Sequence, residues 1–133
     1  MKFAPRNTPF RVTLGERGEM VACQYLVKHG YRILEKNYRC TIGEIDVVAA
    51  KDGRLVFVEI KTRSQKVFGR PEESVGWTKQ RKMIRLAEWY LKDKKKTDAS
   101  VSFAVLAVRW KGTQDPEIRL IEDAFGVQEG GLR

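Results

Sequence analysis

The sequence contains few of the side chains that build zinc centres or disulfide frameworks. Among its 133 residues there is one histidine, His29, and there are two cysteines, Cys23 and Cys40. The two cysteines lack the spacing of metal ligands, and a single histidine cannot complete such a site. We therefore expect Cys23 and Cys40 to be reduced thiols with a structural or incidental role.

Long apolar stretches are also missing. The longest run, residues 103–108, is far shorter than a membrane span. Residues 1–6 carry charges but no apolar stretch behind them, so they do not resemble a signal peptide. We expect a cytoplasmic protein with no membrane partner. A chain of this length is expected to form one domain around a single core.

Acidic residues are fewer than basic residues. The 26 Lys and Arg residues outnumber the 17 Asp and Glu residues, which gives a net charge of +9 and a pI near 9.8. A composition this basic favours a polyanionic partner such as nucleic acid, and an anionic membrane surface is the weaker alternative.

The cations concentrate in one predicted helix, residues 78–94. Arg81, Arg85 and Lys92 recur there at helical spacing, as they would on a surface that follows a phosphate backbone. An ordinary solvated helix face is the alternative. Gln80 falls on the inward stripe and needs a polar partner, either a core carbonyl or a carboxylate or water of a site. The residues expected to contact nucleic acid are Arg63, Lys79, Gln80, Arg81, Arg85 and Lys92.

A predicted hairpin brings three acids and one lysine together. Asp52-Gly53 lies between two alternating apolar runs, and this pair favours a two-residue loop with both residues at positive φ. Counting outward from the loop places Asp46 opposite Glu59 and Glu44 opposite Lys61. Since side chains alternate faces, these four would share one face. The other face would hold Ile45, Val47, Ala49, Val56, Val58 and Ile60.

Two opposed carboxylates on one sheet face are unusual. Like charges placed directly across an antiparallel pair destabilise it, and a solvated strand face would be expected to pair opposite signs. A hard divalent cation between Asp46 and Glu59 would remove the conflict, because Mg²⁺ is commonly held by one or two carboxylates together with waters and substrate phosphate. The spacing therefore favours a metal site over a solvated face.

These residues also resemble a known signature. An acid near the end of one strand followed by Glu-x-Lys on the next looks like the PD-(D/E)XK nuclease signature, carried here by Asp46, Glu59 and Lys61. The wider pattern, from Gly15 to Leu91, resembles the YraN-like proteins, which are predicted endonucleases similar to archaeal Holliday-junction resolvases. That pattern comprises Gly15, Glu19, Tyr25-Leu26, Gly30, Asn37, Gly43-Glu44-Ile45-Asp46, Phe57-Val58-Glu59-Ile60-Lys61-Thr62-Arg63 and Lys79-Gln80.

The chain departs from the general signature at two positions. Ile45 replaces its proline, which is usual for this branch. Gln80 is followed at the fourth position by Ile84 rather than by the tyrosine of RecB-like nucleases, so the resemblance does not extend to exonucleases of that type.

The resemblance implies roles for individual residues. Asp46, Glu59 and the backbone carbonyl of Ile60 would hold Mg²⁺ or Mn²⁺, and Lys61 would hold the attacking water or stabilise charge on the phosphate. Glu44 would orient Lys61 or merely close an ion pair at the strand end. Symmetric cutting of two strands would require a homodimer.

In the first predicted helix, Glu19 is the acid whose side chain is expected to point inward. At 3.6 residues per turn Glu19 borders the inward stripe, whereas Glu16 points to solvent. A surface carboxylate favoured by the helix macrodipole is the alternative. The resemblance implies that Glu19 joins the metal site.

The predicted fold class is α/β, a restriction-endonuclease-like core with a mixed central sheet flanked by helices in the order αβββαββ. Thr13 and Glu16 predict a capping box that opens a helix to His29. Strands are expected at 31–39, 44–61 (the hairpin), 101–107 and 118–125, with a loop at 62–76. A flexible basic arm would cover 1–12, a single nuclease-like domain 13–126 and a C-terminal tail 127–133.

The sequence therefore predicts a metal-dependent endonuclease that hydrolyses phosphodiester bonds in DNA, with branched or structured DNA as a candidate substrate. The alternative is a non-catalytic module that binds branched DNA or structured RNA.

Overall fold

The computed structural model describes residues 12–64, 75–112, 115–128 and 131–132. The predicted basic arm lies outside these residues except for Val12, and most of the predicted loop at 62–76 lies outside them as well.

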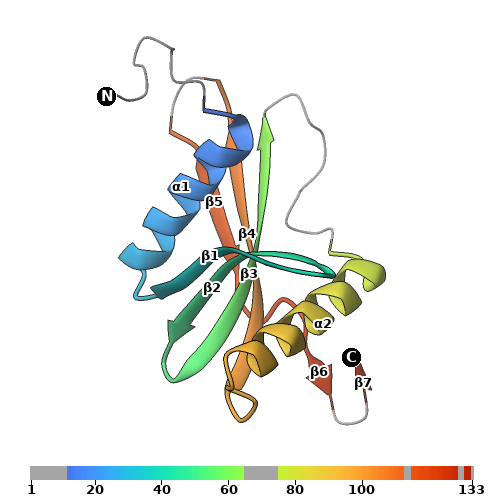
Figure 1. Cartoon of the computed structure of the whole chain (residues 1–133). Helices are drawn as coiled ribbons and strands as arrows, with labels where there is room; N and C mark the ends of the chain where they lie inside the picture. The colour runs from blue at the N-terminus through green and yellow to red at the C-terminus, as the bar shows by residue number, and fades with distance from the viewer. Residues whose placement is uncertain (1–11, 65–74, 113–114, 129–130, 133) are drawn as a thin grey trace, which may run out of the picture.

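One mixed sheet forms the centre of the fold (Figure 1). Its strands lie in the order β1-β2-β3-β4-β5, where β3 and β4 are parallel and the other neighbours are antiparallel. The strands are β1 (Arg32–Cys40), β2 (Gly43–Lys51), β3 (Arg54–Ser64), β4 (Ser100–Trp110) and β5 (Glu117–Ile121). The predicted order αβββαββ is confirmed.

One helix covers each face of the sheet. Helix α1 (Leu14–Lys28) packs Ala22 and Leu26 against one face, and α2 (Trp77–Asp93) packs Met83, Leu86 and Tyr90 against the other. Each face therefore has its own apolar cluster, and the sheet separates the two. No helix among the described residues is long and apolar enough to cross a membrane.

Helix α1 begins at the predicted capping box. The Thr13 hydroxyl accepts a hydrogen bond from the Glu16 N–H at 3.0 Å, and the Glu16 carboxylate accepts one from the Thr13 N–H at 2.9 Å. The helix ends before His29, and Gly30 follows at φ +92°. Where α1 crosses β3, Gly18 lies so close to Thr62 that a Cβ at this position would overlap the threonine side chain. This close crossing fixes the start of α1 over the β3 segment that follows Lys61.

The hairpin turn confirms the prediction from Asp52-Gly53. Asp52 has φ +52° and Gly53 has φ +78°, as the two-residue turn requires. Lys51 pairs with Arg54, and the expected register continues to Val47 opposite Val58. Beyond that pair the ladder between β2 and β3 stops.

The prediction that Ile45 shares a face with Val47 is wrong. Val47 packs in the cluster beneath α1, whereas Ile45 packs with Tyr38 in the cluster beneath α2. The alternation breaks at Asp46, opposite which Asn37 of β1 adopts φ +54°. Asparagine tolerates this left-handed conformation better than most residues, so β1 and β2 bend together at this point.

Three predicted boundaries also differ. Strand β3 continues through Ser64 because it pairs with β4 up to Trp110, so the loop does not begin at 62. Strand β5 ends at Ile121, although a strand was expected to 125. The predicted tail contains two short paired strands, β6 (Val127–Gln128) and β7 (Gly131–Leu132).

Candidate functional site

The site forms where β2 leaves β3. Asp46 and Glu59 were expected to be partners in the ladder, but this is wrong because the pairing ends at Val47 and Val58. Instead the Asp46 carboxylate accepts a hydrogen bond from the backbone N–H of Ile60 at 2.8 Å. The side chain thus takes the acceptor role that a β2 carbonyl would have had, and it is held beside the Glu59-Ile60-Lys61 segment.

The Asp46 carboxylate lies in an unfavourable electrostatic setting. Its pKa is raised to about 6, chiefly by burial and also by Glu59, Glu19 and Glu44, while the hydrogen bond from Ile60 acts in the opposite direction. The three other acids that the sequence singled out therefore act on the Asp46 carboxyl group. This is the environment in which a bound cation would be favourable.

Glu59 lies on the α2 side of the sheet. Its side chain is only 18% exposed and approaches Lys79 of α2, with 3.2 Å between the Lys79 Nζ and a Glu59 carboxylate oxygen. A small cavity between β2, β3 and α2 is lined by both Asp46 and Glu59, with Met83 and Leu86 as its apolar wall. Lys79, in the first turn of α2, therefore places a positively charged side chain at the acidic site.

Lys61 follows Glu59 by two residues on β3 and is half-buried. Burial lowers the pKa of Lys61, and the nearby cations Arg63 and Lys79 lower it as well, while Glu59 has the opposite effect. The ammonium group thus lies within the electrostatic reach of both Glu59 and the basic residues around it.

Glu44 does not face Lys61 as expected. It pairs across β1 and β2 with Arg39, with 3.5 Å between the Arg39 Nε and a carboxylate oxygen. The expectation was wrong because β2 has already diverged from β3 at this position. Glu44 nonetheless lines the same small cavity as Asp46, so it contributes negative charge from the rim.

Glu19 lies near Asp46, as its influence on the pKa of Asp46 indicates. It is half-buried, whereas Glu16 is exposed. Asn37 was not predicted to act at the site, yet its side-chain amide donates to Glu19 at 3.4 Å. The signal for Asn37 was its place in the YraN-like pattern, and its left-handed φ supplies the structural reason for an asparagine there.

The predicted nucleic-acid contacts divide into two groups. Lys79 lies at the acidic site, and Gln80 donates to the Val75 carbonyl at 2.8 Å, which is one of the partners expected for it. Arg63 of β3 is half-buried and donates to the Thr62 carbonyl at 2.9 Å. The second group, Arg81, Arg85 and Lys92, is exposed on α2.

The donor set fits a hard cation with few protein ligands. Among the described residues, no group of three Asp, Glu, His or Cys side chains is arranged to hold a metal ion. Mg²⁺ commonly takes only one or two carboxylates and completes its shell with waters and substrate phosphate. Asp46, Glu59 and the Ile60 carbonyl suit such a shell. The pKa of Asp46 is raised to about 6 by burial and by the neighbouring acids, whose charge a cation would neutralise.

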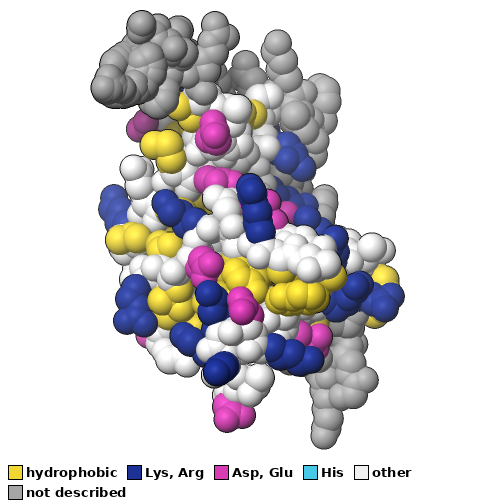
Figure 2. Space-filling model, viewed as in Figure 1, with side chains coloured by type: hydrophobic (Ala, Val, Ile, Leu, Met, Phe, Trp, Pro, Cys, Tyr) yellow, Lys and Arg dark blue, Asp and Glu magenta, His cyan; other side chains and the backbone are white. Residues whose placement is uncertain are grey.

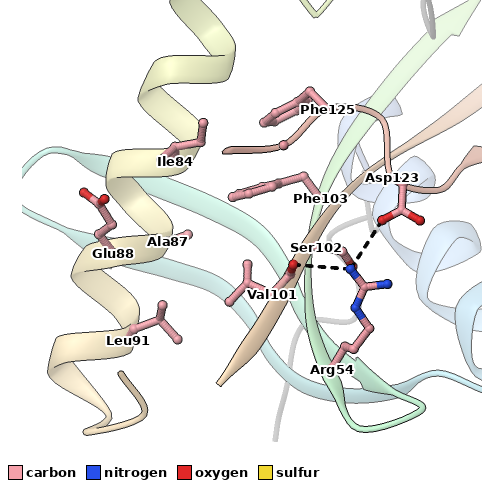
Figure 3. A pocket seen from close by; sticks show the side chains of 11 residues that line it. Arg54, Ile84, Ala87, Glu88, Leu91, Val101, Ser102, Phe103, Asp123 and Phe125 are labelled. Atoms are coloured by element: carbon pink, nitrogen blue, oxygen red, sulfur yellow. Dashed lines mark hydrogen bonds and ion pairs between the residues drawn. The ribbon is translucent and has the colours of Figure 1, made fainter. Parts of the chain in front are cut away.

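A larger cavity lies elsewhere (Figure 3). It measures about 680 Å³ and separates the second half of α2 from the start of β4, with Ile84, Leu91 and Phe103 among its apolar lining. Among the described residues that line it, the cation is Arg54, which lies 3.6 Å from Asp123. Because this charge is already paired, the described lining offers no unpaired cation to a phosphate group.

The fold and the site together define a small basic α/β protein with a cluster of acidic side chains where two strands diverge. The chain belongs to the uncharacterised protein family UPF0102, the YraN-like group, whose family model matches residues 18–108. A UPF0102 protein of Moorella thermoacetica is 44% identical over 84% of this chain and 93% of its own length. Another, from Geotalea daltonii, is 46% identical over 86% of this chain and 91% of its own length.

Among solved structures, SfsA of Pyrococcus furiosus in complex with Ca²⁺ matches 81% of this chain and 61% of its own length. The two share 17% sequence identity and a TM-score of 0.39. A likeness of this extent carries no information on function.

Proposed function

We propose that this protein is a divalent-metal-dependent endonuclease that hydrolyses phosphodiester bonds in DNA. One observation carries the proposal: the half-buried Asp46 carboxylate, with its pKa raised to about 6, is held against the Glu59-Ile60-Lys61 segment by the Ile60 N–H. This supports the PD-(D/E)XK interpretation, because the acid and the Glu-x-Lys segment come together even though the strands no longer pair.

Different side chains would bind the metal ion and the phosphate. Asp46, Glu59 and the Ile60 carbonyl would hold Mg²⁺ or Mn²⁺, with Glu19 and Glu44 adding negative charge around them. When bound, such an ion polarises a phosphoryl oxygen and lowers the pKa of a bound water. Lys79, which now pairs with Glu59, would turn to a phosphate once the ion neutralises that carboxylate.

Lys61 supplies a fixed positive charge. Its half-buried position places the ammonium where solvent screens it less than at the surface. Negative charge grows on the phosphate in the transition state, so a cation already oriented toward it lowers the barrier without reorganisation. The lowered pKa of Lys61 leaves its amine more able to take part in proton transfer to or from the attacking water.

The substrate proposed is branched or structured DNA, on the YraN-like resemblance to Holliday-junction resolvases. Symmetric cutting of such a substrate would bring two copies of the chain together around a two-fold axis.

The test is cleavage of a substrate panel. Linear duplex, flap, four-way junction and single-stranded DNA are incubated with Mg²⁺, Mn²⁺, Ca²⁺ or chelator. We expect cleavage with Mg²⁺ or Mn²⁺ and its loss in Asp46→Asn, Glu59→Gln and Lys61→Ala. The matched control is Glu117→Gln. This change removes an exposed acid on strand β5 that pairs with Lys111, and the variant should cleave at the parental rate.

A non-catalytic nucleic-acid-binding module is the second candidate. The ion pair between Glu59 and Lys79 favours it, because Lys79 already neutralises one proposed ligand without a metal. Binding to the panel with no metal-dependent cleavage of any member would establish this candidate and overturn the endonuclease.

A further inference from the structure

Two tryptophans lie exposed on the outer face of α2. The side chain of Trp77 is 56% exposed and that of Trp89 is 40% exposed, whereas Trp110 is buried at 7%. Large aromatic side chains usually bury most of their surface, and exposed ones on a single face commonly mark a site of interaction. Neither tryptophan takes part in the acidic site.

The two indoles bracket the basic stripe of α2. At about 3.6 residues per turn, Arg81, Arg85 and Lys92 lie near the middle of the exposed face of α2, and Trp77 and Trp89 lie at its two borders. The Arg81 guanidinium lies 6.0 Å from the Trp77 ring. Twelve residues separate the two indoles, which is about 18 Å along the helix axis. Figure 2 shows hydrophobic and cationic side chains side by side where α2 lies.

A hollow of about 560 Å³ lies beside Trp89. Ile42, at the turn between β1 and β2, forms its opposite wall, and Arg85, Glu88, Lys92 and Asp93 complete the lining. Two cations and two acids leave the lining without net charge, and Asp93 already accepts a hydrogen bond from the Tyr38 hydroxyl at 2.8 Å. Such a hollow suits an uncharged planar group with polar edges better than a phosphate.

We propose that the outer face of α2 binds single-stranded nucleic acid by stacking unpaired bases on Trp77 and Trp89, while Arg81, Arg85 and Lys92 hold the intervening phosphates. In a duplex the base faces are covered by neighbouring bases, so only unpaired bases reach the indoles. Aromatic platforms along a cationic track are the general means of binding single strands.

This inference rests on the proposed function, which supplies nucleic acid as the partner. It narrows the substrate class to nucleic acids that contain unpaired bases. Lys79, in the first turn of the same helix, lies at the acidic site. A strand bound along α2 therefore leads toward Asp46 and Glu59, and the preferred substrates carry an unpaired segment next to the bond that is cut.

Binding is measured by titration of an oligothymidine and of a duplex of equal length, in chelator and in an Asp46→Asn background that cannot cleave. Trp77→Leu and Trp89→Leu should each weaken single-strand binding about 5- to 150-fold, because stacking on an aromatic residue contributes roughly 1–3 kcal/mol per base. Duplex affinity should stay the same. Trp77→Phe and Trp89→Phe should retain most of the affinity. Met20→Ala, an exposed apolar position on α1 at the other face of the sheet, should bind as the parent does.

Intrinsic fluorescence supplies the second readout. Stacking should quench the emission of Trp77 and Trp89 as the oligothymidine is added, and the double variant Trp77→Phe/Trp89→Phe should show no quenching because buried Trp110 alone remains. Equal weakening of single-strand and duplex binding, or unchanged single-strand binding in both leucine variants, would overturn the stacking site. Cleavage of the panel by the wild-type chain is scored separately, so loss of the stacking site leaves the proposed function standing.

Discussion

Replacing Asp46 with asparagine should stabilise the metal-free protein at neutral pH. The asparagine side chain has nearly the same shape and keeps an oxygen that accepts the hydrogen bond from the Ile60 N–H. What it removes is a negative charge that is half-buried and faces Glu59, Glu19 and Glu44. The change therefore isolates the electrostatic cost of the site from its packing.

The magnitude follows from the shifted titration. The pKa of Asp46 is raised from an ordinary value of 3.8 to about 6 in the folded protein. Because the folded state holds the proton more tightly than the unfolded state, Asp46 contributes full stability below pH 4 and loses it as the pH rises through 6. At 1.36 kcal/mol per pH unit, the loss at pH 7.5 is about 3 kcal/mol as an upper limit, since the carboxylate is not fully desolvated.

Urea unfolding of both proteins at pH 4 and at pH 7.5, in chelator, measures the effect. Asp46→Asn should exceed the wild type by about 2–3 kcal/mol at pH 7.5 and match it at pH 4. Excess Mg²⁺ should then stabilise the wild type at pH 7.5 by about 2.7 kcal/mol at a hundred times the dissociation constant, and leave the variant unchanged. Glu117→Gln on β5 serves as the control and should show neither effect.

A variant that is less stable than the wild type at pH 7.5 in chelator would refute the reasoning. The carboxylate would then be a structural group whose charge the fold requires, and a metal ion would have nothing to relieve.

Two further predictions test the helices. Gly18→Ala should destabilise the fold by about 1–3 kcal/mol or more, because the added methyl group overlaps Thr62 where α1 crosses β3. The double variant Gly18→Ala/Thr62→Ala should recover part of this loss, as measured by thermal unfolding. In salt titrations of duplex binding, replacing Arg81, Arg85 and Lys92 with alanine should flatten the log–log slope by roughly one for each residue that contacts a phosphate. An unchanged slope would place the phosphate contacts on another face.

Local chemistry was enough to predict much of the fold. The capping box of Thr13 and Glu16 and the turn at Asp52-Gly53 each depend on residues a few positions apart, and both form as expected. The alternation of apolar residues likewise indicated the strands of the central sheet. The register of β2 and β3 near the turn follows from the turn itself.

The divergence of the two strands could not be predicted in the same way. It depends on Ile45 packing in the cluster beneath α2 with Met83 and Leu86, which lie far from it in the sequence. The sequence singled out Asp46, Glu59 and Lys61, but it placed them in a regular ladder. Glu44 was assigned the wrong partner for the same reason, since Arg39 lies across from it on β1.

The way β2 leaves β3 gives the two sides of the site different mechanical properties. Glu59, Ile60 and Lys61 belong to the long parallel ladder with β4, which runs unbroken from Arg54 to Ser64, so displacing any of them disrupts the middle of the sheet. The carboxylate of Asp46 is tied to β3 by the hydrogen bond that it accepts from the Ile60 N–H, and beyond it β2 pairs with β1 alone. We therefore expect the wall formed by β3 to be the more rigid one, and the opposite, two-stranded wall to open more readily.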